Sequence, residues 1–232
     1  MAETGDPLVF PRRSRVRGPS TVAASWWGRA WVRSFEETVL EAADLRTARA
    51  LARSGRLGAV MVISGMASAV LDPGGPTAVI AQIRVRRLDG PSWQAFDTEL
   101  AREAGHLAAL ESGELPADLV EHADDVGVEI VPGAGDLDTA CECDSWAQPC
   151  LHALALLYQL AWLMDADPYV LLLLRGRSRE QLHQLTEDVP PETGEAAARA
   201  ATILALAEDA PTGHGLADSA VAAYDDEVGR LL

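Results

Sequence analysis

The chain has 232 residues, of which 48% are hydrophobic, so it is long enough to bury a core of its own and too apolar to be disordered. Its formal net charge of −16 is spread unevenly, with ten arginines against six acidic residues in residues 1–60 and six arginines against 27 acidic residues in residues 90–232. Because an acidic surface repels phosphate, we do not expect an extended DNA-binding face on the C-terminal part. We expect the protein alone to bind duplex DNA only weakly.

No contact with a membrane is expected. The N-terminus lacks the apolar region of a signal peptide, and no apolar stretch approaches the roughly 18–20 residues of a membrane span. We therefore expect a cytoplasmic protein. In that reducing compartment, three clustered cysteines are more often metal ligands than disulfide partners.

The first 22 residues are rich in proline, arginine, glycine and serine, which predicts a loose arm. The next segment repeats large apolar side chains at steps of four, four and five residues: Trp27, Trp31, Phe35 and Leu40. This spacing is typical of an amphipathic helix, and we expect that helix to pack through its tryptophans. A second segment of helical or mixed character then ends at Gly55.

Three apolar segments follow, rich in β-branched residues and separated by glycine or by the turn sequence DPGG. They are Gly58–Ser64, Ala67–Leu71 and Thr77–Arg87. Their partial alternation of apolar and polar residues predicts a small antiparallel meander.

The elements after the meander are mostly helical. Ser92 is a suitable N-cap and Gly113 a suitable end for one helix. A short helix over residues 114–127 and a strand over Val128–Pro132 precede the cysteines. Beyond the cysteines we expect a strong helix over about Pro149–Met164, two short helices around Pro168–Arg175 and Ser178–Leu185, and an acidic, alanine-rich helical tail.

All three cysteines lie within ten residues, and a histidine follows two positions after the last one. The spacing C-x-C-x6-C-x-H is formed by Cys141, Cys143, Cys150 and His152. Zinc in structural sites takes four such nitrogen and sulfur ligands in a tetrahedron. Residues two apart lie on the same side of an extended segment, so the first two cysteines could face one ion. Pro149 favours the start of a helix at the last two ligands.

Three other interpretations of this cluster are free thiols that meet a histidine by chance, a redox pair and a catalytic zinc. A redox pair is disfavoured because the spacing is C-x-C rather than C-x-x-C and no βαβ pattern surrounds it. A catalytic zinc is disfavoured because four protein ligands leave no open position for water. We predict one structural Zn²⁺ per chain, bound by three thiolates and one imidazole nitrogen.

The cluster and its setting resemble the SWIM zinc finger, a family named after SWI2/SNF2-type ATPases and MuDR transposases. The family's CxCx(n)CxH positions are matched by Cys141, Cys143, Cys150 and His152, and Asp144 and Trp146 resemble residues of its loop. The finger covers about residues 128–165. More of the chain, including WWGRAW, GELPADLV and DPYVLLLLRGRSREQL, is similar to short actinobacterial SWIM-finger proteins. Such proteins are often encoded beside an SNF2-family helicase, so the resemblance implies a partner of that type.

A stripe of arginines recurs at steps of three and four residues and could share one helix face: Arg46, Arg49, Arg53 and Arg56. Such a stripe can meet phosphate or an acidic partner, and the alternative is a solvated face with ion pairs to the acidic half. A second small cluster, formed by Arg175, Arg177 and Arg179, has the same solvated interpretation. The remaining histidines, including His106, have no ligand partner at helical spacing.

These patterns predict an α+β protein with a small antiparallel sheet and flanking helices, a zinc-bound strand–loop–helix finger and a helical C-terminal region. We divide it into a loose arm (1–22), an N-terminal α+β region (23–127), the finger (128–165), a helical extension (166–186) and an acidic helical tail (187–232). No Walker A, GxSxG, HExxH or dinucleotide motif is present. We expect a non-catalytic accessory protein that binds a protein partner, an SNF2-family DNA-dependent ATPase by the resemblance, and helps to target it to DNA. The alternative is a nucleic-acid-binding protein that uses the arginine-rich N-terminal region.

Overall fold

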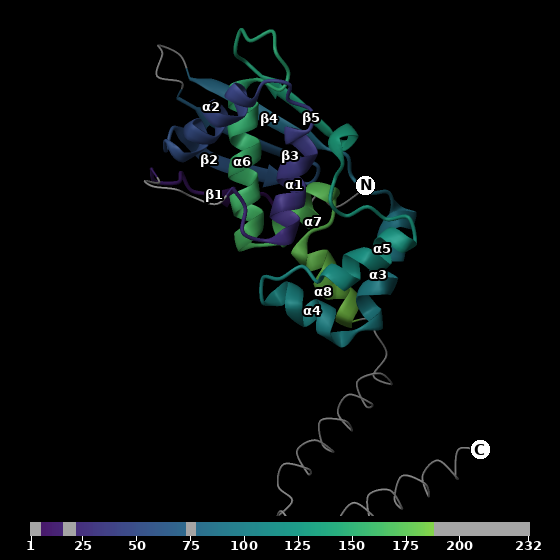
Figure 1. The fold of residues 1–232 in the computed structure, drawn as a ribbon. Coiled ribbons are helices and arrows are strands. Elements are labelled where there is room, and N and C mark those ends of the chain that lie inside the picture. Colours follow the sequence, from purple (N-terminus) through teal and green to yellow (C-terminus); the bar gives the residue numbers. More distant parts are fainter. Residues whose placement is uncertain (1–5, 16–21, 73–77, 188–232) are drawn as a thin grey trace, which may run out of the picture. The chain divides into compact units, whose positions relative to one another are not determined.

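The computed structural model describes residues 6–15, 22–72 and 78–187, and it shows the predicted α+β class (Figure 1). Five antiparallel strands form one sheet in the order β1-β2-β3-β4-β5. The strands are β1 Leu8–Phe10, β2 Leu57–Ile63, β3 Met66–Leu71, β4 Val79–Val85 and β5 Leu137–Cys141. Strands β2 to β4 confirm the predicted meander, because each pairs antiparallel with the next strand in sequence.

Helix α6, Leu151–Ala166, packs against one face of this sheet. The sheet presents small buried side chains there, Ala67, Ala69 and Ala81, which let the helix approach closely. Helix α6 is apolar nearly all round, as expected of a helix that is covered on more than one side. Its remaining sides are covered by α1, Trp26–Glu36, and α2, Ala42–Arg53.

The tryptophans of α1 are packing residues, as the sequence predicts. Trp31 is fully buried, and its Nε1 donates a hydrogen bond to the carbonyl oxygen of Leu157 on α6 at 3.0 Å. Trp27 is also buried and donates in the same way to Met164, at 2.9 Å. Each indole therefore contributes both a large apolar area and a satisfied polar group to the α1–α6 contact.

A second group of helices gathers beyond one end of the sheet (Figure 1). It comprises α3 Gly90–Arg102, α4 Ala104–Glu111, α5 Ala117–Asp125, α7 Tyr169–Arg175 and α8 Arg179–Glu187. The single helix expected between Ser92 and Gly113 is in fact two, α3 and α4. Glu103 between them is extended, with φ −128° and ψ 117°, so the helical hydrogen-bond pattern stops there.

Two predicted elements need correction. Part of the expected loose arm is ordered, because β1 pairs with β2 in the register Leu8↔Val62 and forms one edge of the sheet. The strand expected over Val128–Pro132 is not a strand in the structure. Its alternate residues Val128 and Ile130 are buried, which explains the strand-like pattern, but the carbonyl of Glu129 accepts a hydrogen bond from Arg175 instead of pairing in a sheet.

The arginines predicted as a second solvated cluster are mostly not solvated. Arg175 is 2% exposed and also donates to the carbonyl of Arg86 and to Asp136. Arg177 pairs with Asp97 and lies over the ring of Trp93. Of the three, Arg179 is the most exposed, with 45% of its side chain accessible, and it pairs with Asp167 at 3.4 Å.

The predicted region 23–127, finger 128–165 and extension 166–186 belong to one compact unit, because β5 completes the sheet and α6 fills its core. The predicted acidic tail lies outside the described residues, apart from its first residue. Among the described helices, none has both the length and the apolar character needed to cross a bilayer.

Candidate metal centre

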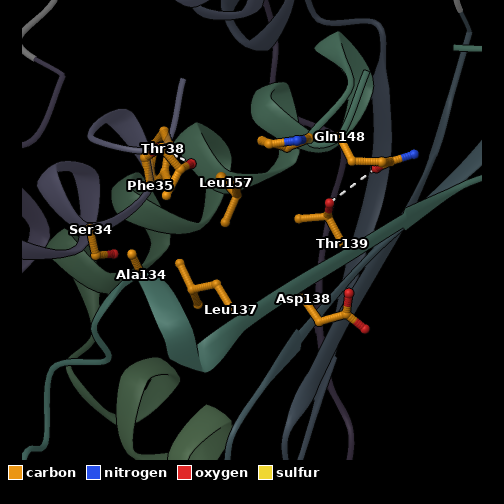
Figure 2. A pocket seen from close by; sticks show the side chains of 10 residues that line it. Ser34, Phe35, Thr38, Ala134, Leu137, Asp138, Thr139, Gln148 and Leu157 are labelled. Carbon is orange, nitrogen blue, oxygen red and sulfur yellow. Dashed lines mark hydrogen bonds between the residues drawn. The ribbon is translucent and has the colours of Figure 1, made fainter. Parts of the chain in front are cut away.

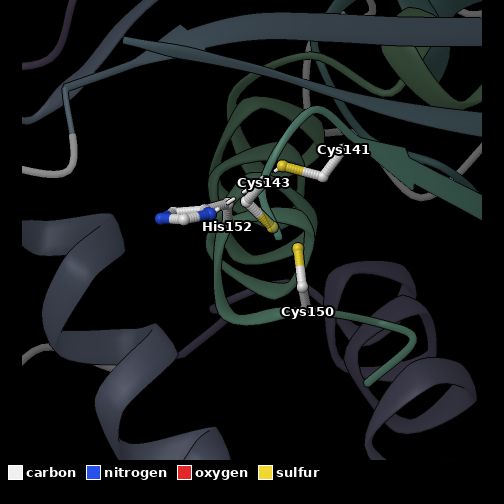
Figure 3. A group of neighbouring side chains, drawn as sticks. All are labelled: Cys141, Cys143, Cys150 and His152. Carbon is white, nitrogen blue, oxygen red and sulfur yellow. Dashed lines mark hydrogen bonds between the residues drawn. The ribbon is translucent and has the colours of Figure 1, made fainter. Parts of the chain in front are cut away.

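Four potential metal ligands lie close together between the end of β5 and the start of α6 (Figure 3). Cys141 is the last residue of β5, and Cys143 lies in the bend that follows. Cys150 is the N-cap of α6, and His152 is in the first turn of the same helix. The structure thus brings together all four residues that the sequence predicts as ligands.

The distances suit a single ion. One ligand atom from each residue lies within 4.8 Å of each of the others, and the Sγ of Cys141 is 3.8 Å from Nδ1 of His152. Zinc–sulfur bonds of about 2.3 Å at tetrahedral angles put ligand atoms roughly 3.8 Å apart. The cluster could therefore hold a metal ion with little rearrangement.

Sheet pairing fixes the first half of the site. Cys141 lies opposite Ala81 in the β4–β5 register. The next residue, Glu142, donates its backbone N–H to the carbonyl of Ile80 at 3.1 Å and accepts from the N–H of Ile80 through its carboxylate at 3.1 Å. This two-way contact holds the residue between the first two cysteines at the sheet edge.

The start of α6 fixes the second half. The backbone of Cys150 is extended, with φ −75° and ψ 167°, and its Sγ accepts a hydrogen bond from the N–H of Ala153 at 3.4 Å. The positive end of the helix dipole favours negative charge on that sulfur. Across the loop, Thr139 donates to the side-chain oxygen of Gln148 at 3.2 Å, which ties the two halves together.

The thiols and the imidazole differ in their protonation. Burial raises the pKa of Cys141 to about 12 and also raises the pKa of Cys150. Burial alone would raise the pKa of Cys143, but hydrogen bonds from the N–H of Ser145 and from the other two thiols lower it. Burial lowers the pKa of His152, so its ring is neutral near pH 7 and can offer a nitrogen lone pair. A bound cation would favour the thiolate form of all three cysteines.

A cavity of about 290 Å³ lies beside this loop, between α1 and β5 (Figure 2). Its hydroxyl groups are already used: Ser34 donates to the carbonyl of Trp31, Thr38 to that of Phe35, and Thr139 to Gln148. Since these polar groups bond to the protein and do not converge on the cavity, we assign it no chemistry.

His106, which the sequence suggests is without a ligand partner, has two carboxylate neighbours. Its Nε2 lies 3.1 Å from Asp118 on α5 and 3.6 Å from Glu103. The ring is buried, whereas both carboxylates are exposed. The hydrogen bond to Asp118 ties α4 to α5, and it lowers the pKa of that carboxyl group. The sequence gives no sign of the contact with Asp118, because helical spacing does not relate the two residues. Glu103, however, lies three residues before His106, so the expectation of no partner at helical spacing is wrong.

The predicted arginine stripe is divided by the structure. Three of its members, Arg46, Arg49 and Arg53, line one cavity with residues of α6. Arg49 is partly committed, since it pairs with Glu36 and donates to the hydroxyl of Tyr158 at 2.9 Å. Arg56 is not among the residues that line this cavity.

Among curated proteins, the chain is similar to the uncharacterized protein Rv2102 of Mycobacterium tuberculosis (strain ATCC 25618 / H37Rv), with 31% identity over 176 residues. The match covers 74% of this chain and 63% of the relative, so the chain spans less than two thirds of the length of that protein. No family model matches the sequence. No solved structure matches it either.

Proposed function

We propose that this protein is a non-catalytic accessory protein of the SWIM-finger type, in which a structural zinc ion fixes a loop that docks onto a protein partner. The observation that carries the proposal is the convergence of Cys141, Cys143, Cys150 and His152 within 4.8 Å at the two ends of that loop. Three thiolates and one imidazole suit zinc better than magnesium or calcium, which prefer oxygen ligands. With four protein ligands, the ion would have no open position for a reacting water.

The loop between the ligands carries a residue suited to recognition. Trp146 is 95% exposed, although a tryptophan normally buries much of its area. Exposed aromatic side chains held on a rigid support are frequent energetic anchors of protein interfaces. A single ion bound by residues at both ends of the loop would restrict the motion of the loop. The loop would then lose less conformational entropy when it binds a partner.

The partner we propose is an SNF2-family DNA-dependent ATPase, and the compartment is the cytoplasm. The support for this partner is the resemblance of the ligand spacing to the SWIM finger, and the support for the compartment is the cluster of cysteines that a reducing environment keeps available for metal. The protein would help to target the ATPase to DNA.

Two measurements test the proposal. Elemental analysis of the purified protein is expected to give one zinc per chain, and a protein free of metal contradicts it. For the partner, tagged protein is used to capture ligands from nuclease-treated lysate, with mass spectrometry as the readout. An SNF2-type ATPase is expected with the wild type and lost with Trp146→Ala.

The matched control is Val126→Ala, which removes an exposed apolar side chain from the end of α5. It should retain the ATPase. Retention by Trp146→Ala, or release of the ATPase by nuclease treatment of the wild type, would contradict a direct protein contact through the loop.

A further inference from the structure

A cavity of about 320 Å³ lies between α2 and α6 and combines arginines with aromatic rings. Its lining residues are Val22, Arg46, Arg49, Arg53, Tyr158 and Trp162. The arginines are spaced three and four residues apart on α2, and the two aromatic residues are four apart on α6, so each set lies on one helix face. The cavity therefore has a basic wall on α2, and of the two rings on α6 only that of Trp162 is partly exposed, because Tyr158 is fully buried.

A second cavity, of about 280 Å³, lies where the N-terminal segment passes the end of α2. It is lined by Arg12, Arg13, Ser14, Arg15, Ser54 and Gly55. Arg13 links the two cavities, because its guanidinium lies 4.7 Å from the centre of the Trp162 ring. The sequence does not predict that residues 12–15 lie beside the end of α2, since the two segments are about thirty residues apart in the chain.

The N-terminal segment is held against α2 by specific contacts. Arg12 Nε donates to the carbonyl oxygen of Gly55. Gly55 has φ +75°, and a Cβ there would lie 3.1 Å from the backbone nitrogen of Arg15 and 3.3 Å from the carbonyl oxygen of Arg13. Glycine is thus needed both for the left-handed backbone and for the close approach of the segment. Arg13 and Arg15 are positioned by the fold.

The lining of the two cavities is rich in arginine. Together the residues that line the two cavities include six arginines and, within the described parts of the chain, no aspartate or glutamate. Glu36 does not line either cavity, but it forms an ion pair with Arg49. The concentration of guanidinium groups stands out in a protein whose formal net charge is −16.

We propose that these two cavities form a binding site for single-stranded nucleic acid, with phosphates on the arginines and a base against Trp162. Guanidinium groups match phosphate in geometry and charge, and nucleobases stack on aromatic rings. Arginines spread over two linked cavities suit a ligand with several phosphates better than one phosphate group. The partly exposed ring of Trp162 favours unpaired bases over a duplex, whose bases are stacked on each other. This site is separate from the metal ligands and goes beyond the proposed function.

The test is fluorescence anisotropy with a labelled oligothymidylate of about 12 nucleotides and purified full-length protein. The double variant Arg46→Gln/Arg53→Gln is expected to weaken binding at least about tenfold. It should also reduce the slope of log K against log salt by about 1.4, because each single-strand phosphate contact contributes about 0.7. Trp162→Leu is expected to weaken binding about 5- to 150-fold without a comparable change of slope.

The charge-matched control is Arg84→Gln/Arg179→Gln, which removes two exposed arginines that lie outside the cavities. It should change affinity less than twofold, and circular dichroism should show that all variants are folded. Equal weakening by both double variants would mean that only net charge matters and would overturn the site. Displacement of the oligonucleotide by an equal charge concentration of polyglutamate would overturn it in favour of an acidic peptide. Tighter binding of a duplex of the same length would overturn the single-strand specificity.

Discussion

Cys150 and Ala153 form a helix cap through sulfur: the N–H of Ala153 donates to the Sγ of Cys150 at 3.4 Å, and the same Sγ lies within 4.8 Å of the other three candidate ligand atoms. A thiol is a weaker acceptor than the hydroxyl or carboxylate oxygens that usually cap helices. The stability of the first turn of α6 therefore depends on whether this sulfur is a thiol, a thiolate or a metal ligand. Since α6 fills the core, a metal ion at the cap would stabilise much more than the loop.

Replacing Cys150 with serine separates the two roles of the residue. Serine keeps the cap, because its oxygen can accept the N–H of Ala153, and it removes the thiolate. We expect Cys150→Ser to lose the metal and to lose hydrogen-exchange protection in β5 and the first turns of α6, while β2 and β3 are less affected. Binding energy at such a site is largely folding energy, which is why the loss should reach beyond the ligands.

The companion variant Cys150→Ala removes both cap and thiolate. It should also lack metal and should be less stable than Cys150→Ser by about 1 kcal/mol, the usual value of an N-cap. If Cys150→Ser keeps the protection of β5 and α6, the cluster is only a group of neighbouring free thiols.

Gly28 lies beside Asp165, and this contact decides the effect of a substitution in α1. A Cβ on Gly28 would clash with Oδ1 of Asp165. That carboxylate accepts hydrogen bonds from the N–H groups of Ala24 and Ser25, at 2.7 and 2.9 Å, and from the hydroxyl of Ser25. Alanine favours a helix by up to about 1 kcal/mol over glycine, but displacing a charged acceptor of three bonds loses more. We expect Gly28→Ala to destabilise the protein by about 1–3 kcal/mol.

Gly105 is the matched control, because it is also helical and a Cβ there would meet nothing within 4 Å. Gly105→Ala should stabilise the protein by up to about 1 kcal/mol. Urea denaturation of both variants gives the two values. Changes of opposite sign in the free energy of unfolding of the two variants support the α1–α6 contact. If Gly28→Ala stabilises the protein, Asp165 can move aside without losing its hydrogen bonds.

The sequence is sufficient to predict those elements whose local pattern agrees with their final environment. The meander, the tryptophan helix and the helix after His152 are of this kind, and so is the convergence of the four candidate ligands, because their spacing is tied to a strand end and a helix start. The segment Val128–Pro132 shows the opposite case. Its alternation of buried residues is real, but its backbone is committed to Arg175, which lies more than forty residues later.

The arginines show why the candidate sites were only partly predictable. Helical spacing relates Arg46 to Arg49 and Arg53, so the sequence predicts that they share a face. The sequence does not indicate that Arg13 lies over the ring of Trp162 or that Arg175 is buried. Both contacts depend on how distant segments pack together. From their charge alone, both arginines would be expected to be solvated. In the structure Arg13 lies over an aromatic ring and Arg175 is buried.

Trp31 is expected to be the most important tryptophan for stability. It is 0% exposed, and its Nε1 donates to the carbonyl of Leu157. Trp31→Phe removes that donor and leaves space in the core, so the free energy of unfolding should fall by about 2–3 kcal/mol. The same change at the exposed Trp146 is the control and should alter stability by less than about 0.5 kcal/mol. Thermal unfolding measures both, and equal effects would contradict the described packing of α1 on α6.

Arg175 joins three segments of the chain through one buried guanidinium. It donates to the carbonyls of Arg86 and Glu129, the latter at 2.7 Å, and to the carboxylate of Asp136 at 3.3 Å. Arg175→Met keeps much of the side-chain volume but leaves these acceptors without their donor. Removal of one partner from a buried ion pair typically lowers stability by about 3–5 kcal/mol, because the other charge stays behind. We expect a loss of that size.

Lysine at the same position separates charge from geometry. An ammonium group restores the charge but cannot spread its donors over three acceptors as a planar guanidinium does, so Arg175→Lys should recover only part of the loss. The exposed Arg84, paired with Asp138 at 3.5 Å, is the control, and Arg84→Met should change stability by less than about 1 kcal/mol. Chemical denaturation gives all three values. If Arg175→Lys is as stable as the wild type, charge alone holds these segments together, and if Arg175→Met is as stable, the network does not contribute.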